Sequence, residues 1–208
     1  MMNSEREYRS FSLIERAKTE EPDYICEGYA STFEPYVLFR DEEDDIDYVE
    51  QIDPHAFDEA DMSDCVFRVD HMGPVYARVS AGTVKLDVDD KGLHQVADLS
   101  KTASARALHE DIVAGNYPQM SFAFTVAEAH VVRDAKEGTI TRIIDRVAKV
   151  FDISPVTWPA NPTTSLSARS NECINGEIEA LKAERLELER RAEALERFNK
   201  LLQEASND

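Results

Sequence analysis

The chain changes character before its last quarter, and this change limits the folds that are open to it. Residues 22–165 read mainly as short strands, whereas apolar residues recur in alternating steps of four and three over 174–202. Those steps form a heptad seam, interrupted by Arg185 and Asn199. The change therefore predicts a strand-rich domain and one long helix, joined by the Pro-, Ser- and Thr-rich segment 158–171.

The helix sets the domain organisation. A single helix of this kind cannot bury its own apolar stripe, so we expect the seam over 174–202 to be unpaired in an isolated monomer and to pair with another chain. Folding of the helix back onto its own domain is the alternative. We predict four regions: an N-terminal segment over 1–22, a main domain over 23–160, a linker over 161–173 and an amphipathic, coiled-coil-type helix over 174–205.

Strands dominate the expected structure of the main domain. Residues 24–33 have strand composition, and residues 66–71 alternate so that His71 ends a strand. The alternating runs 83–88 and 93–99 flank a turn with Asp and Gly, which predicts a β-hairpin. Further strands are expected over 120–126, 139–148 and 150–157.

One helix is expected to interrupt these strands. Apolar residues recur at helical spacing over 105–113, with Thr102 or a neighbouring serine available as the N-terminal cap. Gly115 and Asn116 supply its stop. Ser121 then begins the next strand, directly after the helix and its turn.

The charge balance excludes one class of partner. The chain has 42 acidic and 23 basic residues, and its net charge is −19. A phosphate backbone needs clustered Lys and Arg, so nucleic acid is not the expected main partner. The acidic run at 41–45 is interpreted as a solvated loop, with attraction of a basic partner peptide as the alternative.

Cysteine use and hydropathy indicate the compartment. Cys26, Cys65 and Cys173 are odd in number and widely spaced, as expected of free thiols in a reducing compartment. No run of 18 apolar residues occurs, and the N-terminus has no apolar signal segment. We therefore expect a soluble intracellular protein without a membrane partner.

The chemistry of the chain has to be assembled across long distances in sequence. There is no HExxH motif, no Cys/His pair at ligand spacing, no P-loop and no GxGxxG turn, so no metal and no cofactor are expected. A serine nucleophile needs a base within hydrogen-bond reach and a group that orients the base. Ser121 enters an aromatic strand after a turn, a placement that could expose its side chain at the edge of a barrel. His71 ends a strand, so these two residues could meet in the fold.

A series of phrases in the same order resembles the prohead proteases of tailed phages. The phrases span about residues 24 to 162 and are EGYASTFEP, VEQIDPHAF, VFRVDHMGPVYAR, DVDDKGLHQVADL with DIVAGNYPQ, MSFAF, and VFDISPVTWPANP. The chain departs from the family pattern at several positions: His55, Ala77 and Ala123 stand where glycine is usual, and Asp70 and Met72 differ beside the histidine.

The resemblance implies a fold, an activity and a site. The fold would be α+β, a mostly antiparallel β-barrel flanked by helices as in herpesvirus assembly proteases, followed by the long C-terminal helix. By position, Ser121 would be the nucleophile, His71 the general base and Asp152 the third member of a triad, with no metal or cofactor.

The same resemblance implies partners and a place of action. The substrates would be the phage major capsid protein and scaffold, cleaved inside the immature prohead in the host cytoplasm, together with the protease itself. The C-terminal helix would dock on scaffold or sister subunits, so a homo-oligomer is expected. The linker over 161–173 is the candidate region for self-cleavage.

Three alternatives stay open at this point. The chain could be a non-enzymatic capsid scaffolding or assembly protein, which the long acidic helix favours. It could be an unrelated hydrolase acting on small esters, although it has no GxSxG elbow. Cys65 could be the nucleophile, although no base can be argued for it from the sequence.

Overall fold

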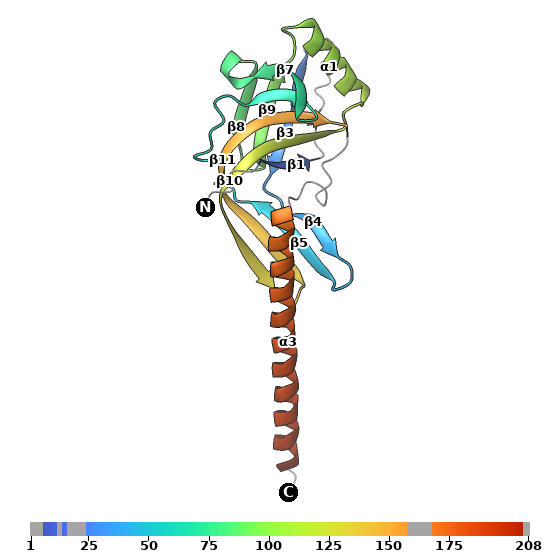
Figure 1. The fold of residues 1–208 in the computed structure, drawn as a ribbon, viewed down its shortest axis with the longest axis vertical. Coiled ribbons are helices and arrows are strands. Elements are labelled where there is room, and N and C mark those ends of the chain that lie inside the picture. The colour runs from blue at the N-terminus through green and yellow to red at the C-terminus, as the bar shows by residue number, and fades with distance from the viewer. Residues whose placement is uncertain (1–5, 12–13, 16–23, 158–167, 206–208) are drawn as a thin grey trace.

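In the part of the chain that the structure describes, strands in two sheets and two α-helices make up the α+β fold (Figure 1). The structure is a computed structural model that describes residues 6–11, 14–15, 24–157 and 168–205. Along the described chain the elements are β1 (Glu7–Phe11), β2 (Ile14–Glu15), β3 (Ile25–Thr32), β4 (Tyr36–Asp41), β5 (Ile46–Ile52), β6 (Val66–Val69), β7 (Met72–Arg78), the 3₁₀ turn η1 (Val79–Ala81), β8 (Val84–Val88), β9 (Gly92–Asp98), α1 (Ala103–Ala114), β10 (Gln119–Asp134), β11 (Thr139–Val156) and α3 (Ala168–Ala205).

The larger sheet is built around the hairpin of β10 and β11. Its strand order is β1-β10-β11-β5-β4, and β6 pairs with β11 and with β7. Among the described residues, only the pairings of β11 with β5 and β6 are parallel. The smaller sheet has the order β2-β3-β9-β8 and is antiparallel throughout. The expectation of a mostly antiparallel fold is therefore confirmed.

A common core lies between the two sheets and below α1. The side chains with no exposed surface include Phe67, Leu93, Phe122 and Ile153, which come from four different strands. Phe122 and Phe124 stack with their ring centres 4.4 Å apart. The apolar face that the alternation of residues 120–126 predicts is therefore the one that fills the core.

Several local predictions are confirmed. The hairpin of β8 and β9 and the strand β3 form where the alternating patterns place them. Helix α1 begins after Thr102, whose hydroxyl accepts a hydrogen bond from the Ala105 amide, and it ends at Gly115 in the left-handed region with φ of 89°. The capping chemistry of the sequence thus sets both ends of this helix.

Other elements differ from the sequence-based expectation. The strand that should run through His71 stops at Val69, because residues 70 and 71 form a turn. The runs 139–148 and 150–157 are one strand, β11, and β10 continues to Asp134. Strand β1 was not predicted, because it covers five residues and its partner β10 lies far away in sequence. Strands β4 and β5, which pair with each other across a short turn, were not predicted either.

The long helix α3 has two parts. Its attached half, up to about residue 187, packs on the strands, and its free half, residues 188–205, extends beyond them. Ile174, Ile178 and Leu181 are buried against strand residues of the projecting part of the larger sheet. Those strand residues are Leu38, Ile46, Tyr48 and Ile140. The expectation that the whole seam over 174–202 is unpaired is therefore wrong for its first turns, because the strands provide an apolar surface of their own.

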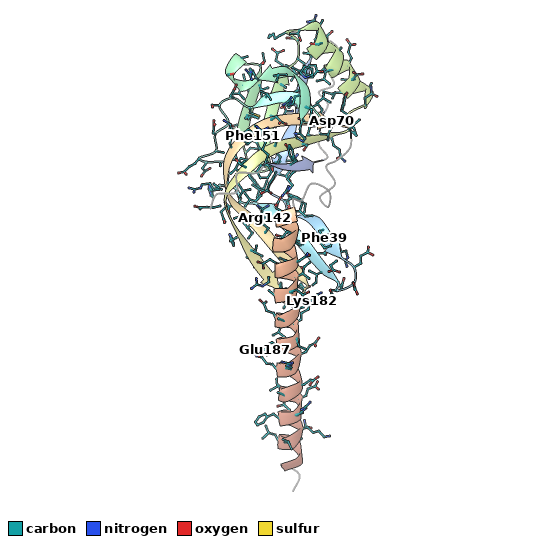
Figure 2. The ribbon with its side chains drawn as sticks, viewed as in Figure 1. Phe39, Asp70, Arg142, Phe151, Lys182 and Glu187 are labelled. Atoms are coloured by element: carbon teal, nitrogen blue, oxygen red, sulfur yellow. The ribbon has the colours of Figure 1, made fainter. Side chains whose placement is uncertain are left out.

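Polar contacts fasten the attached half of α3. Arg185, which interrupts the seam, donates to the backbone carbonyls of Asp44, Asp45 and Ala135. Lys182 pairs with Asp44, and Figure 2 shows Lys182 where the helix passes the strands. The guanidinium thus donates hydrogen bonds to the backbone carbonyls of two turns, and these bonds explain why a charged residue stands at a seam position.

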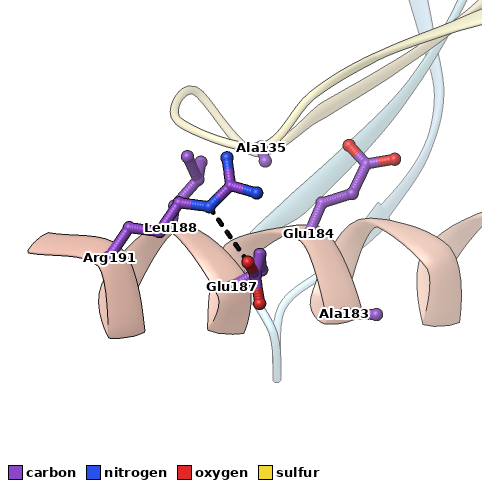
Figure 3. A pocket seen from close by; sticks show the side chains of 6 residues that line it. All are labelled: Ala135, Ala183, Glu184, Glu187, Leu188 and Arg191. Atoms are coloured by element: carbon purple, nitrogen blue, oxygen red, sulfur yellow. Dashed lines mark hydrogen bonds and ion pairs between the residues drawn. The ribbon is translucent and has the colours of Figure 1, made fainter. Parts of the chain in front are cut away.

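Beyond these contacts the helix leaves the strands. An open hollow beside Ala135 marks the place; Ala183, Glu184, Glu187, Leu188 and Arg191 line its helix side (Figure 3). Large apolar side chains farther along are exposed: Leu195, Phe198, Leu201 and Leu202. None of the helices in the described ranges combines the length and apolar character that a membrane span requires.

Two truncations should separate the attached half of α3 from the free half. Removal of residues 188–208 should leave the stability of the domain nearly unchanged. Removal of residues 171–208 should lower it, because each of the three buried seam residues contributes roughly 1.5–3 kcal/mol. Urea unfolding of both forms measures the difference.

A pair of point variants controls for the loss of chain length. Leu181→Ala should cost about 2–5 kcal/mol, because Leu181 has no exposed surface, whereas Leu195→Ala should stay within about 0.5 kcal/mol. Equal stability of Leu181→Ala and Leu195→Ala would show that α3 does not belong to the folded core.

Candidate active site

Ser121 lies in the middle of three paired strands. It belongs to β10, opposite Ser154 of β11 on one side and opposite Ser10 of β1 on the other. Its side chain has no exposed surface. The sheet therefore fixes the position of this hydroxyl from both sides, although the sequence alone suggested an exposed residue at a barrel edge.

His71 is held in a tight turn between β6 and β7. Val69 pairs with Met72, so the loop consists of Asp70 and His71 alone, with φ of 47° and 58°. Two-residue hairpin loops of the I′ type need positive φ at both positions, and glycine or asparagine usually supplies it. A histidine in this conformation is strained, and such strain persists only where the surroundings hold it.

Four hydrogen bonds hold this turn against the end of β11. The Asp70 amide donates to the Pro155 carbonyl at 3.2 Å, and the His71 amide donates to the Ser154 hydroxyl at 3.2 Å. The Asp70 carboxylate accepts from both the amide and the hydroxyl of Thr157, at 2.9 and 2.5 Å. Asp70, labelled in Figure 2, thus anchors the histidine to the strand that carries Asp152.

The structure brings Ser121, His71 and Asp152 together in one line of hydrogen bonds. The distance from His71 Nε2 to Ser121 Oγ is 2.8 Å, and the distance from His71 Nδ1 to Asp152 Oδ1 is 2.6 Å. A separation within about 4 Å is what a loose nucleophile–base pair requires. These three residues, which are far apart in sequence, therefore meet as the sequence analysis expected.

Asp152 is buried rather than on an outward strand face. Its Oδ1 accepts from His71 and also from the Ser154 hydroxyl, at 2.8 Å. A carboxylate accepts but does not donate, so it favours the His71 tautomer that carries its proton on Nδ1. Nε2 is then left with a lone pair that faces Ser121. Ser154, which sequence reasoning missed, holds both Asp152 and the backbone of His71.

The first strand covers this line of residues. The Ser121 hydroxyl lies 2.9 Å from the carbonyl oxygen of Arg9, to which it can donate. The Tyr8 ring lies against the His71 ring, with centres 4.6 Å apart. Strand β1 therefore contacts both the hydroxyl and the imidazole of the candidate site.

Buried charges fasten β1 in place. The Arg9 guanidinium donates to both Glu50 oxygens, at 2.5 and 2.8 Å, and Tyr36 donates to Glu50 at 2.5 Å. Arg142 bridges Glu50 and Glu7, at 2.7 Å to each. Burial alone would raise the pKa of Glu50, but the charges and hydrogen bonds of Arg9 and Arg142 hold that pKa below its ordinary value.

The remaining histidines do not join the site. His55 is exposed and pairs with Asp58, and His130 pairs with Asp145. His94 lies beside Glu27, and His109 faces the Ile25 carbonyl. No group of three or more His, Cys, Asp or Glu side chains in the part of the chain that the structure describes is placed to hold a metal ion.

Cys65 is poorly suited to act as the nucleophile. It is fully buried, and burial, together with the nearby Asp152 charge, raises the pKa of its thiol to about 12. The thiolate is the reactive form, so a thiol in this setting is unreactive near neutral pH. The structure thus disfavours Cys65 as the nucleophile and favours Ser121.

The arrangement is one that can activate a hydroxyl. A base within hydrogen-bond reach of the nucleophile and a carboxylate that orients the base are the parts of a serine hydrolase site. The comparison with protein families is consistent with this class: the model of the caudovirus prohead serine protease family matches residues 11–177. The chain belongs to that family. No curated protein and no solved structure matches it.

Some of the residues around the site could have been found from the sequence. Ser154 follows Asp152 by two positions, so the two side chains share one strand face. The alternation of Glu7, Tyr8 and Arg9 is a strand signal, but nothing near it indicates where the strand pairs. Aspartate is common in turns, so a turn at Asp70 could have been predicted, but its hydrogen bonds to Thr157 form only in the packed fold.

The buried charge cluster predicts an acid-sensitive stability. Glu50→Gln should lower the free energy of unfolding at pH 7 by about 3–5 kcal/mol, because Arg9 and Arg142 lose a buried partner. Since the pKa of Glu50 is lowered in the folded protein, its contribution is complete above pH 4.5 and is lost as the pH falls further.

Urea unfolding at pH 7, 5 and 3.5 tests this. The difference between wild type and Glu50→Gln should stay constant down to about pH 5 and shrink at pH 3.5. Asp47→Asn, which removes a partly exposed partner of the half-exposed Arg40, is the control and should change little. A difference that already shrinks between pH 7 and 5 would mean that the pKa of Glu50 is raised instead.

Proposed function

We propose that this chain is the serine endopeptidase of phage prohead maturation, which cleaves capsid or scaffold proteins during capsid assembly. The observation that carries the proposal is the continuous hydrogen-bonded line from Ser121 through His71 to the buried Asp152. Membership in the prohead serine protease family supports the same activity.

In the proposed mechanism, His71 acts as the general base. It takes the Ser121 proton while the hydroxyl oxygen attacks a peptide carbonyl carbon, and it later gives that proton to the leaving amine. Asp152 holds the imidazole in its reactive tautomer and stabilises the imidazolium. Water then attacks the acyl-enzyme, with His71 again as base, and releases the acid product. Ser154 and Asp70 hold the His71 imidazole and the Asp152 carboxylate in the positions that this proton transfer needs.

The proposed partners are the phage capsid protein and scaffold inside the prohead, in the host cytoplasm. The exposed apolar residues on the free half of α3 support docking of this helix on scaffold or on sister subunits, in a homo-oligomer. Self-cleavage is proposed in the segment expected as a linker, 161–173. Residues 161–167 lie outside the described residues, and residues 168–173 form the start of α3 rather than a linker. No nucleic acid or membrane takes part in this proposal.

We also propose a specific fold type for the two sheets. We infer a barrel of the herpesvirus-protease type, supported by two sheets that share one core and by a helix that packs between them and the solvent. An experimental structure, compared with herpesvirus assembly proteases, would test this description independently of activity.

A scaffolding role is the second candidate function. The free half of α3 favours it, because Leu195, Phe198 and Leu201 offer a surface without a use in catalysis. A protein with this role alone would not need Ser121, whereas a protease that also docks on scaffold would need both. The two candidates therefore differ in the effect of single substitutions at the site.

Substitutions at the three site residues test the proposal. With the presumed capsid protein co-expressed, Ser121→Ala and His71→Ala should each abolish processing, and the double variant should be no worse than either, because the pair acts as one unit. Asp152→Asn should lower the rate by about 10⁴-fold, since an amide favours the wrong tautomer. New N-termini are read by mass spectrometry.

The controls separate catalysis from folding. His55→Ala removes an exposed histidine and should process its substrate normally. Circular dichroism should show that Ser121→Ala keeps the fold. Normal processing by a folded Ser121→Ala variant would refute the enzymatic role and leave the scaffolding role.

A further inference from the structure

Strand β1 lies on the edge of β10 in the manner of an added peptide. Among the described strands it is the outermost of its sheet, and its pairing with β10 runs antiparallel from Glu7 opposite Phe124 to Phe11 opposite Met120. Many proteins bind extended peptides in this way, with backbone bonds for affinity and side-chain pockets for specificity. The edge that β1 covers carries Ser121 at its centre.

The contact between β1 and Ser121 resembles a bound but unreactive substrate. The Arg9 carbonyl lies beside the hydroxyl, yet its oxygen faces Ser121 Oγ at 2.9 Å. Attack requires the carbonyl carbon to face the nucleophile. A hydroxyl also has one proton, so donation to Arg9 competes with donation to His71 Nε2 at 2.8 Å. Bound this way, β1 occupies the site without being cleaved.

The guanidinium of Arg9, the residue whose carbonyl faces Ser121, fills a position that we call the Arg9 pocket. Glu50 is fully buried there and accepts hydrogen bonds from the guanidinium with both carboxylate oxygens. Two parallel hydrogen bonds of this kind suit arginine in particular, because its planar fork matches a carboxylate. Tyr36 donates to the same carboxylate from the side.

A second charge contact lies two residues before Arg9. Glu7 accepts from Arg142, which also donates to Glu50, so the cluster holds two positive and two negative groups. Removal of β1 takes one charge of each sign away. It leaves Glu50 without the two hydrogen bonds that Arg9 donates, and Arg142 without the acceptor oxygens of Glu7. A strand that replaces β1 restores both sets only if it carries an acidic residue two positions before a basic one.

We propose that the edge of β10 covered by β1 is the peptide-binding site of this enzyme, and that Glu50 and Arg142 select substrate strands with the pattern acidic–any–basic. This inference rests on the proposed peptidase activity and names its substrate class. The basic residue takes the place of Arg9, so cleavage falls on its carboxyl side. Strand β1 must leave the edge before a substrate can bind.

A peptide series on the full-length protein tests the selectivity. Quenched fluorescent peptides built on Glu-Tyr-Arg-Ser-Phe carry Arg, Lys, Ala or Glu at the third position. We expect kcat/KM to fall in that order, with Arg at least roughly tenfold above Ala, as expected for a charge-assisted hydrogen bond. Mass spectrometry should place the cut after the basic residue. Equal rates for all four peptides would overturn the proposal.

Access to Ser121 is measured separately with a fluorophosphonate that labels activated serines. Arg9→Ala weakens the hold on β1, so it should raise the labelling rate several-fold. Arg40→Ala is the matched control, because it removes an exposed arginine paired with Asp45 and Asp47. An unchanged rate in Arg9→Ala would show that β1 does not restrict the site and would overturn its role as the occupant.

Glu50→Gln tests the Arg9 pocket itself. It should reduce the preference for Arg over Ala, and circular dichroism checks that the variant is folded. If it does not fold, the peptide series and Arg9→Ala still decide. Labelling and cleavage without a preference for the basic residue would overturn this inference and leave the proposed function intact. A full-length protein that neither labels nor cleaves any peptide would overturn both.

Discussion

The antiparallel pairing of β10 with β11 is the interaction on which the rest of the structure depends. At one end it places Ser121 opposite Ser154, two residues from Asp152, and at the other it forms part of the platform for α3. Irregularities between Ala123 and Ala129 divide the hairpin into these two parts. Such bulges bend a strand and increase its twist. One hairpin can therefore pack in the main core with one part and against α3 with the other.

The site combines a rigid strand pair with a strained turn. Ser121 and Asp152 sit within regular ladders, where packing on both faces restricts their movement. His71, by contrast, is in a left-handed conformation that a histidine rarely adopts, held by the bonds of Asp70 to Thr157. The turn keeps the His71 ring outside the ladder, where it contacts both Ser121 and Asp152.

The sequence was most informative where chemistry and local pattern coincide. Ser121, His71 and Asp152 could be named from the phrases around them, and α1 from its capping residues. Strand β1 could not be placed, because its pairing with β10 spans more than a hundred residues and its pattern covers five. The Arg9–Glu50 contact, 41 residues apart, likewise exists only after folding. The seam of α3 was recognised, but whether strands or a second chain cover it depends on surfaces that periodicity does not describe.

If β1 blocks the candidate nucleophile as proposed, its attachment to the same chain affects when cleavage can begin. A tethered strand meets its binding edge at an effective concentration set by the tether, in the millimolar range for short flexible connections, and dilution does not lower it. A free peptide displaces it only where the peptide is comparably concentrated. Under the proposed function, substrate proteins packed around the protease in a closed shell would reach that regime, whereas the same sequences scattered through a cell would not. Local crowding, rather than a separate activator, would then set the onset of cleavage.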